Sequence, residues 1–275
     1  MTIMLRTPGS PLARLKTVRR IISELCLAAR MVCDYRSYFR IATDLLLCRL
    51  LRFLQLPPSN KKRQIRMRGN ICITYRLNLG DVQSICEVWL QESYKLPFTA
   101  KSDVLVDLGA NIGLTSLWLA KRYGYSTIIA LEPSFENARL ARMNLETNGV
   151  RALVLEAAIG PEDATAFFDD NEESNRGRVS SSGRPVIMLT MRSVLSNLPS
   201  GTAVDLVKMD IEGGEEPLLN GNREWLGCTQ AIIVEFHPTL IDYPSAINIL
   251  KNEGFRYIAS GTAHKDSMDT FVRRS

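Results

Sequence analysis

A chain of 275 residues is long enough for one large domain with a buried core and an appendage. Its 45% hydrophobic and 23% charged residues are typical of globular proteins. No uninterrupted apolar run reaches the roughly 18 residues of a membrane span, which argues against a spanning helix. The net charge of +5 is modest but unevenly distributed along the chain.

Basic residues are concentrated near the N-terminus. Between Met1 and Arg68, 15 Lys and Arg residues stand against only three acids, Glu24, Asp34 and Asp44. This segment therefore carries +12, which leaves −7 for the remainder of the chain. We expect two parts of opposite character, a basic helical extension at 1–58 and the main domain at 59–275.

The cysteines indicate the compartment. They form no CxxC pair and no evenly spaced framework, so we expect reduced thiols in a cytoplasmic protein. Charges repeatedly interrupt the early apolar residues, and no signal peptide is expected.

Residues 12–56 show helical periodicity, which Pro57 and Pro58 end. We interpret this segment as a basic helical lid packed on the main domain. The alternative is an interfacial helix that touches anionic lipid and holds the protein peripherally at a membrane, or a surface that receives an acidic or lipid-linked substrate. Nucleic acid is not expected as a partner, because no stacking aromatics are interleaved with a recognisable binding motif.

The main domain alternates strands with helices. A strand or hairpin at 64–79 and a helix at about 81–92 precede it. Strands are predicted at 104–108, 127–131, 153–157, 204–209 and 231–236, with helices at 114–123 and 135–148 between the first three. This alternation predicts an α/β fold with a parallel sheet. The polar segment 169–184 is expected to be a long loop or lid, and the chain to close with a β-hairpin.

The segment "DLGANIG", residues 107–113, follows the first of these strands, where an open parallel sheet binds ligands. Its glycines let the backbone approach a ligand closely. Glu132 ends the next strand, where a carboxylate can accept hydrogen bonds from ribose hydroxyls. A dinucleotide site requires further glycines, and Asp107 would repel a pyrophosphate. The same acid suits the ammonium and sulfonium groups of S-adenosylmethionine, which we therefore predict as the cofactor.

Longer motifs carry a family resemblance. "VDLGANIGLTSLWLA" with "ALEPSFENARLARMNLETNG" resembles class I S-adenosylmethionine-dependent methyltransferases, and "DLVKMDIEGGEEPLLNG" with "AIIVEFHP" resembles the FkbM family within them. The resemblance runs from about Gly69 to Phe271. It implies a doubly wound, mostly parallel, seven-stranded sheet of the Rossmann-like methyltransferase fold. One departure is Thr190-Met191-Arg192, where family members usually carry T-L-D.

The resemblance also implies roles for particular residues. The loop would hold the methionine part of the cofactor, Glu132 its ribose, and Ala157 and Ala158 would flank the adenine. Asp210 would face the donor or the incoming hydroxyl. The loop residues concerned are Asp107, Gly109, Asn111 and Gly113.

Four side chains are candidates for the chemistry: Asp210, Glu212, Glu235 and His237. The members of each pair are two residues apart and follow neighbouring strands, so they are expected to converge beside the cofactor. An imidazole with a pKa near 6.5 suits removal of a hydroxyl proton, so we predict His237 as the general base, oriented by Glu235 or Asp210. Glu215 and Glu216 are assigned to a helix start.

Two alternatives for this cluster stay open. His237 could cap its strand before Pro238 without any chemistry. The cluster could also bind a divalent metal, although its spacing is not that of a known closed ligand set, and no metal is predicted.

The sequence therefore predicts an O-methyltransferase acting on a hydroxyl of a glycan, a lipid-linked sugar or a secondary metabolite, an acceptor class that rests on the resemblance. The alternatives are a non-catalytic scaffold that binds the cofactor or a partner through its basic helices, and a nicotinamide-dependent oxidoreductase, which the missing glycines disfavour.

Overall fold

The computed structural model describes residues 11–57, 59–99, 103–169, 177–180, 182–260 and 268–274. The predicted N-terminal helical segment forms two helices, α1 (Pro11–Met31) and α2 (Tyr35–Phe53). Asp34 caps α2 by accepting a hydrogen bond from the Ser37 backbone N–H at 2.8 Å. An antiparallel hairpin, a helix and a π-helical turn follow: β1 (Lys62–Met67), β2 (Ile71–Arg76), α3 (Leu79–Ile85) and η1 (Cys86–Leu90).

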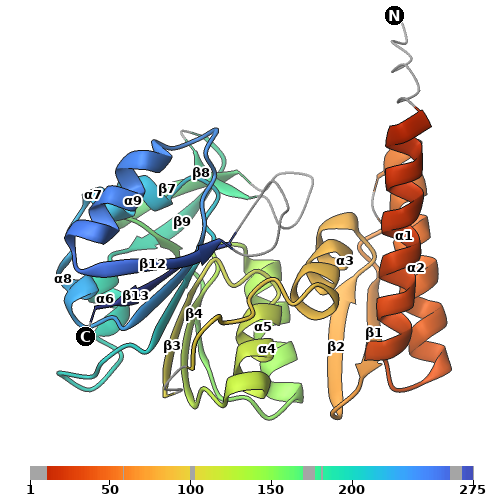
Figure 1. Ribbon diagram of the computed structural model, residues 1–275, viewed down its shortest axis with the longest axis horizontal. Coiled ribbons are helices and arrows are strands. Elements are labelled where there is room, and N and C mark those ends of the chain that lie inside the picture. The colour runs from red at the N-terminus through yellow and green to blue at the C-terminus, as the bar shows by residue number, and fades with distance from the viewer. Residues whose placement is uncertain are drawn as a thin grey trace, which may run out of the picture.

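A seven-stranded sheet forms the centre of the main domain (Figure 1). Its strand order is β12-β13-β11-β10-β3-β4-β5. The five strands from β11 to β5 are parallel. Within the terminal hairpin, β13 is antiparallel to both β11 and β12, so it is the one strand of this sheet that runs against the others, which confirms the predicted fold class. The strands are β3 (Val104–Leu108), β4 (Thr127–Leu131), β5 (Leu153–Leu155), β10 (Leu206–Met209), β11 (Ala231–Glu235), β12 (Phe255–Ser260) and β13 (Met268–Arg273).

Helices cover both faces of this sheet, as a doubly wound fold requires. Leu105 of β3 packs toward α4 and α5, whereas Val104 and Val106 pack toward the helices of the opposite face, because successive side chains of a strand alternate. The helices on the first face are α4 (Leu114–Tyr123) and α5 (Phe135–Thr147). Those on the second are α6 (Met191–Leu195), α7 (Glu215–Asn220), α8 (Glu224–Gly227) and α9 (Tyr243–Asn252).

A smaller four-stranded sheet, in the order β6-β9-β7-β8, follows β5 in the chain. Its strands are β6 (Ala158–Ile159), β7 (Ala164–Asp169), β8 (Arg178–Ser180) and β9 (Arg184–Leu189). The segment predicted as a loop or lid therefore contains the strand β8, while residues 170–176 and 181 lie outside the described residues.

The N-terminal helices share a core with the rest of the chain. Ile41 and Cys48 of α2 belong to the same buried cluster as Ile73 of β2 and Leu117 of α4. The division at residue 58 follows the change in charge along the chain, but packing is continuous across it.

The edge of β2 is closed by side chains rather than by another strand. Asn144 and Asn148, near the end of α5, each accept a hydrogen bond from a backbone N–H of β2 and donate one to the carbonyl of the same residue, Thr74 or Cys72. Asn144 also donates to the carbonyl of Ile112 at 2.8 Å. The hairpin is thereby fastened to the loop that follows β3.

Candidate active site

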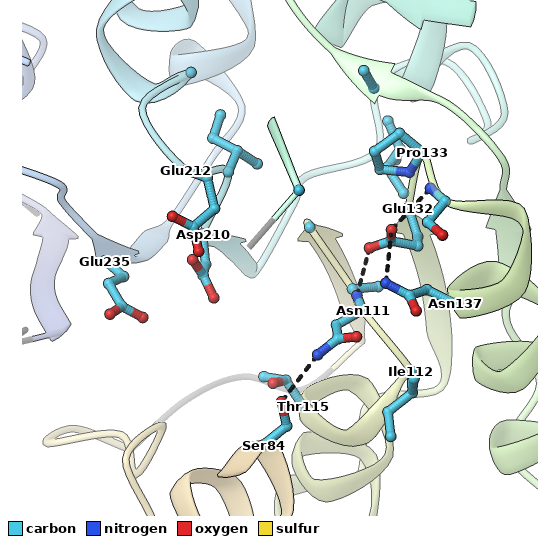
Figure 2. A pocket seen from close by; sticks show the side chains of 18 of the residues that line it. Ser84, Asn111, Ile112, Thr115, Glu132, Pro133, Asn137, Asp210, Glu212 and Glu235 are labelled. Carbon is cyan, nitrogen blue, oxygen red and sulfur yellow. Dashed lines mark hydrogen bonds between the residues drawn. The ribbon is translucent and has the colours of Figure 1, made fainter. Parts of the chain in front are cut away.

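A cavity of about 940 Å³ opens at the carboxyl ends of β3, β4, β10 and β11. Parallel strands of one sheet end at the same edge, and this edge is where open α/β sheets bind ligands. Figure 2 shows the cavity from close by, with Asn111, Glu132 and Asn137 on one side and Asp210, Glu212 and Glu235 on the other. We call these sides the donor wall and the acceptor wall.

Glycine is required at two points of the loop after β3. Gly109 has φ +76°, and a Cβ there would collide with the backbone carbonyl of Asp210. Gly113 has φ +78°, and its Cβ would lie 2.9 Å from the Cα of Ala141. The loop therefore passes between β10 and α5 with no room for a side chain at either position, which leaves Asn111 at the cavity.

Glu132 organises the donor wall. Its two carboxylate oxygens accept hydrogen bonds from the backbone N–H groups of Asn111 at 2.8 Å and Ser134 at 2.9 Å, and Asn137 Nδ2 donates a third at 3.3 Å (Figure 2). Arg76 in turn donates to Asn137 at 2.6 Å. Burial raises the pKa of Glu132 to about 7 and outweighs these hydrogen bonds, which lower it.

The predicted cofactor residues divide into two groups. Gly109, Asn111, Glu132, Ala157 and Ala158 line the cavity. Ala157 lies beyond the end of β5, and Ala158 begins β6 rather than ending a strand of the main sheet. Gly113 and Asp107 lie behind the wall, buried from the solvent.

The prediction that the charge of Asp107 meets the cationic groups of the cofactor is wrong. Its carboxylate is fully buried, lies 3.1 Å from the ammonium of Lys208 and accepts a hydrogen bond from Ser116 Oγ at 2.6 Å. Lys208 already balances its charge, so Asp107 does not offer a negative charge to a cationic ligand.

Lys208 is a site residue that the sequence reasoning missed. Its ammonium donates to the carbonyl of Gly109 at 2.6 Å and lies 3.8 Å from Asp210. Burial alone would lower the pKa of Lys208, but Asp107 and Asp210 outweigh it and the pKa is raised. Tyr94 Oη donates to Asp210 at 3.3 Å. A lysine inside the apolar strand "LVKM" was the available signal, because a buried cation needs partners.

The acceptor wall brings the predicted catalytic residues together. β10 and β11 are parallel neighbours, and Asp210, Glu212, Glu235 and His237 all line the cavity beyond them. Asp210 and Glu212 follow the end of β10 and lie in a loop, so this pair converges without sharing a strand face.

The residue that orients His237 is not the predicted one. His237 Nδ1 lies 3.1 Å from Oε1 of Glu215, and Nε2 lies 3.3 Å from Oε2 of Glu212. Glu215 does begin α7, as predicted, but its side chain is fully buried and also accepts hydrogen bonds from the backbone N–H groups of Ile211 and Gly213. With Nδ1 occupied by Glu215, the other ring nitrogen is turned to the carboxylates of the cavity wall.

These neighbours change the acidity of His237. Burial lowers its pKa, but the hydrogen bond to Glu215 and the charges of Asp210, Glu215 and Glu212 outweigh it and raise the pKa to about 9. The expectation of a value near 6.5 is therefore wrong. Ligand-type atoms of Asp210, Glu212 and His237 also lie within 4.8 Å of one another, a spacing that could hold a metal ion.

Comparisons with known proteins show the family of this chain. The family model of the methyltransferase FkbM domain matches residues 107–257, a range that contains every predicted site residue. The chain belongs to the FkbM methyltransferase family. Methyltransferase 1 of Beauveria bassiana is 24% identical over 62% of this chain and 78% of its own length. Methyltransferase sdnD of Sordaria araneosa is 26% identical over 62% of this chain and 80% of its own length.

Among solved structures, the FkbM methyltransferase of Methylobacillus flagellatus aligns with 94% of this chain at 15% identity and a TM-score of 0.46. This chain spans 60% of that longer protein. The helices α1 and α2 lie outside the range that the FkbM family model matches.

Proposed function

We propose that this methyltransferase uses S-adenosylmethionine to methylate a hydroxyl oxygen of a small molecule or glycan. The observation that carries the proposal is the position of His237. His237 lines the cavity, Glu215 holds its Nδ1, and its Nε2 lies 3.3 Å from Glu212, another residue of the cavity lining. An imidazole held in one orientation at a cavity wall is suited to taking a proton from a bound hydroxyl.

The donor wall fits the proposed cofactor. Asn111 Oδ1 is a buried acceptor without a hydrogen-bond partner among the described residues, and it can accept from an ammonium group. Gly109 allows close approach of the backbone, and the buried carboxylate of Glu132 has further lone pairs for ribose hydroxyls. Ala157 and Ala158 leave room for a flat ring system. S-adenosylmethionine supplies an already activated methyl group.

The residues of this chain then have two tasks, alignment and proton removal. Lys208 ties the loop after β3 to β10 and so holds both walls at a fixed separation. His237 takes the hydroxyl proton at Nε2, and Glu215 stabilises the imidazolium that results. Because the pKa of His237 is about 9, the positive charge of a bound donor favours the neutral imidazole that this step needs.

A proton rather than a metal ion balances the acceptor wall in this proposal. His237 in its charged form lies between Glu212 and Glu215, so the carboxylates already have a cation. Activity is therefore expected to survive dialysis against EDTA. Loss of activity on chelation, restored by Mg²⁺ or Mn²⁺, would assign the cluster to metal binding instead.

The acceptor can be identified directly. The purified protein is incubated with a small-molecule extract and S-adenosylmethionine that carries a ¹³C-labelled methyl group, and products that gain the label are found by mass spectrometry. Calorimetry with S-adenosylhomocysteine and with NAD tests the cofactor separately. Labelled methyl ethers are expected, and a protein that binds NAD but not S-adenosylhomocysteine would contradict the proposal.

A further inference from the structure

The helix α2 has two apolar faces, and only one of them is buried. Ile41, Leu45 and Cys48 pack into the core. On the other side, Tyr35, Phe39, Leu46, Leu50 and Phe53 are all exposed. At about 100° per residue these five side chains fall within about 60° of arc, so they form one continuous stripe. We call it the α2 stripe.

The exposure of the α2 stripe is large for residues of this size. Phe53 is 82% exposed and Leu50 52%. On α1 beside it, Ile22 is exposed as well. Single exposed apolar residues are normal on protein surfaces, but a run of five along a helix marks an interaction surface.

Positive charge prevails around the stripe because two of the three acids of this region are buried. Glu24 and Asp44 are buried; Arg49 pairs with Glu24, and Tyr75 Oη donates to Asp44 at 2.7 Å. Asp34 is used as the cap of α2. Of the three acids in the first 68 residues, only Asp34 is partly exposed, so the basic side chains of this surface outnumber the acids that face the solvent.

The basic side chains lie next to the stripe. Arg36 and Arg40 follow its border on α2, and Arg40 donates to the carbonyl of Gln64 in β1 at 2.7 Å. This bond places β1 beside α2, and the exposed Lys61, Lys62, Arg66 and Arg68 lie on or next to β1. The surface therefore combines an apolar stripe with a cationic border.

We propose that this face of α1, α2 and β1 docks on the surface of an anionic phospholipid bilayer. Acyl chains cover an apolar stripe while acidic headgroups meet its basic border, which is the pattern of an interfacial amphipathic helix. None of the described helices is long and apolar enough to cross a bilayer, so the contact is peripheral. The proposal does not depend on the acceptor or on the chemistry at His237.

Charge argues against the other occupants. A symmetric dimer through this face would bring two cationic borders together, which is repulsive. A nucleic acid would satisfy the cations, but its phosphate backbone would leave Leu46 and Leu50 exposed to water. An anionic bilayer supplies both an apolar layer for the stripe and negative charge for its basic border.

The chain segments next to the docked face also contribute to the cavity lining. Asn60, in the linker between α2 and β1, lines the cavity, as does Arg76 at the end of β2. Figure 1 shows α1 and α2 at one end of the molecule, with α9 at the other end. A bilayer that contacts α2 is therefore closer to the cavity wall formed by the hairpin than to α9.

The test is flotation of the full chain with phosphatidylcholine vesicles, with or without phosphatidylserine. We expect binding to the phosphatidylserine vesicles, and its loss in about 1 M salt, where the Debye length falls to about 3 Å. The variant Leu50→Asp/Phe53→Asp is expected to lose binding, and Ile187→Asp, exposed on the second sheet, to retain it. The variant Lys61→Glu/Lys62→Glu should weaken partitioning at least about 25-fold, since each of the two cations near an anionic surface contributes a factor of about five. Lys251→Glu on α9 is its control.

A second measurement does not depend on losing function. In Phe53→Trp, brominated lipids should quench the new indole, whereas the indole of Ile187→Trp should stay unquenched; the native Trp89, Trp118 and Trp225 are buried. Absence of binding to phosphatidylserine vesicles at low salt would overturn the proposal. So would equal losses in the stripe variant and the Ile187→Asp control, or a wild-type oligomer that Leu50→Asp/Phe53→Asp converts to a monomer without any vesicle binding.

Discussion

The two walls of the cavity are built by different physics. The donor wall is fixed by main-chain geometry, since Gly109 has no alternative and backbone N–H groups hold Glu132. The acceptor wall is held by ion pairs, because His237 lies between the carboxylates of Glu212 and Glu215. The first wall is suited to binding a constant ligand, whereas the second is suited to moving a proton.

The pKa is raised in both walls, but for different physical reasons. The pKa of Glu132 is raised because burial penalises its negative charge, and that of His237 because neighbouring carboxylates stabilise its positive charge. Removing a neighbour therefore affects the two groups differently. Variants in each wall should separate binding of the donor from the chemical step.

The largest effect is expected at the acceptor wall. His237→Ala should lower kcat by about 10²–10⁴, the usual contribution of a general base, while the affinity for S-adenosylhomocysteine stays within about two-fold because the donor wall is intact. Initial rates with the identified acceptor and calorimetry measure the two quantities. His264→Ala, at the chain's other histidine, is the control. A His237→Ala protein of normal kcat would place the base elsewhere.

The second-largest effect is expected on stability, at the ion pair of Lys208 with Asp107 that joins the two walls. Lys208→Met leaves the carboxylate of Asp107 buried without its cation, and should reduce the free energy of unfolding by about 3–5 kcal/mol. The double variant Asp107→Asn/Lys208→Met should recover part of the loss. Urea denaturation measures both, and Lys251→Met on the exposed surface of α9 should change stability by less than about 0.5 kcal/mol. A single variant as stable as the wild type would show that the pair does not hold the walls together.

The pair of Lys208 and Asp107 also shows what could not be predicted from the sequence. Apolar runs and glycine positions predicted the strands β3 and β4. Glu132 was found as the acid that directly follows β4. Both signals are local in the sequence. The pairing of Lys208 with Asp107 was missed, since it connects residues a hundred positions apart that only the strand order brings together.

Glu215 shows a different limit. Its place at a helix start was predicted correctly from neighbouring residues, yet its side chain is directed inward to His237. A local pattern fixes the backbone of an element but not the tertiary partner of each side chain. The same holds for the family departure at Arg192, which pairs with Glu224 on the surface and not at the cavity.

The donor wall should respond through binding. If Glu132 binds the ribose as proposed, Glu132→Gln is expected to weaken S-adenosylhomocysteine binding by about ten- to a hundred-fold, the range for hydrogen bonds to a charged group. In the wild type the affinity should rise with pH through about 7 as Glu132 ionises, and in the variant it should not. Glu146→Gln, exposed on α5, is the matched control. Equal pH dependence in variant and wild type would remove Glu132 from the ribose site.

The smallest effect is a shift in a pH profile. Wild-type kcat/KM should rise with pH through about 9, because only neutral His237 can take a proton in the free enzyme. In Glu212→Gln the imidazolium loses a negative neighbour at 3.3 Å, so the midpoint should fall by about one unit.

Stability should change with the same group. The raised pKa of His237 contributes stability that is fully present below about 6.5 and is lost as pH rises through about 9, so Glu212→Gln should destabilise the protein more at pH 6 than at pH 10. Glu253→Gln, near the end of α9, should leave the kinetic profile unchanged. If the Glu212→Gln midpoint does not move while its stability does, His237 titrates as described but a carboxylate of the acceptor wall, rather than the imidazole, removes the proton.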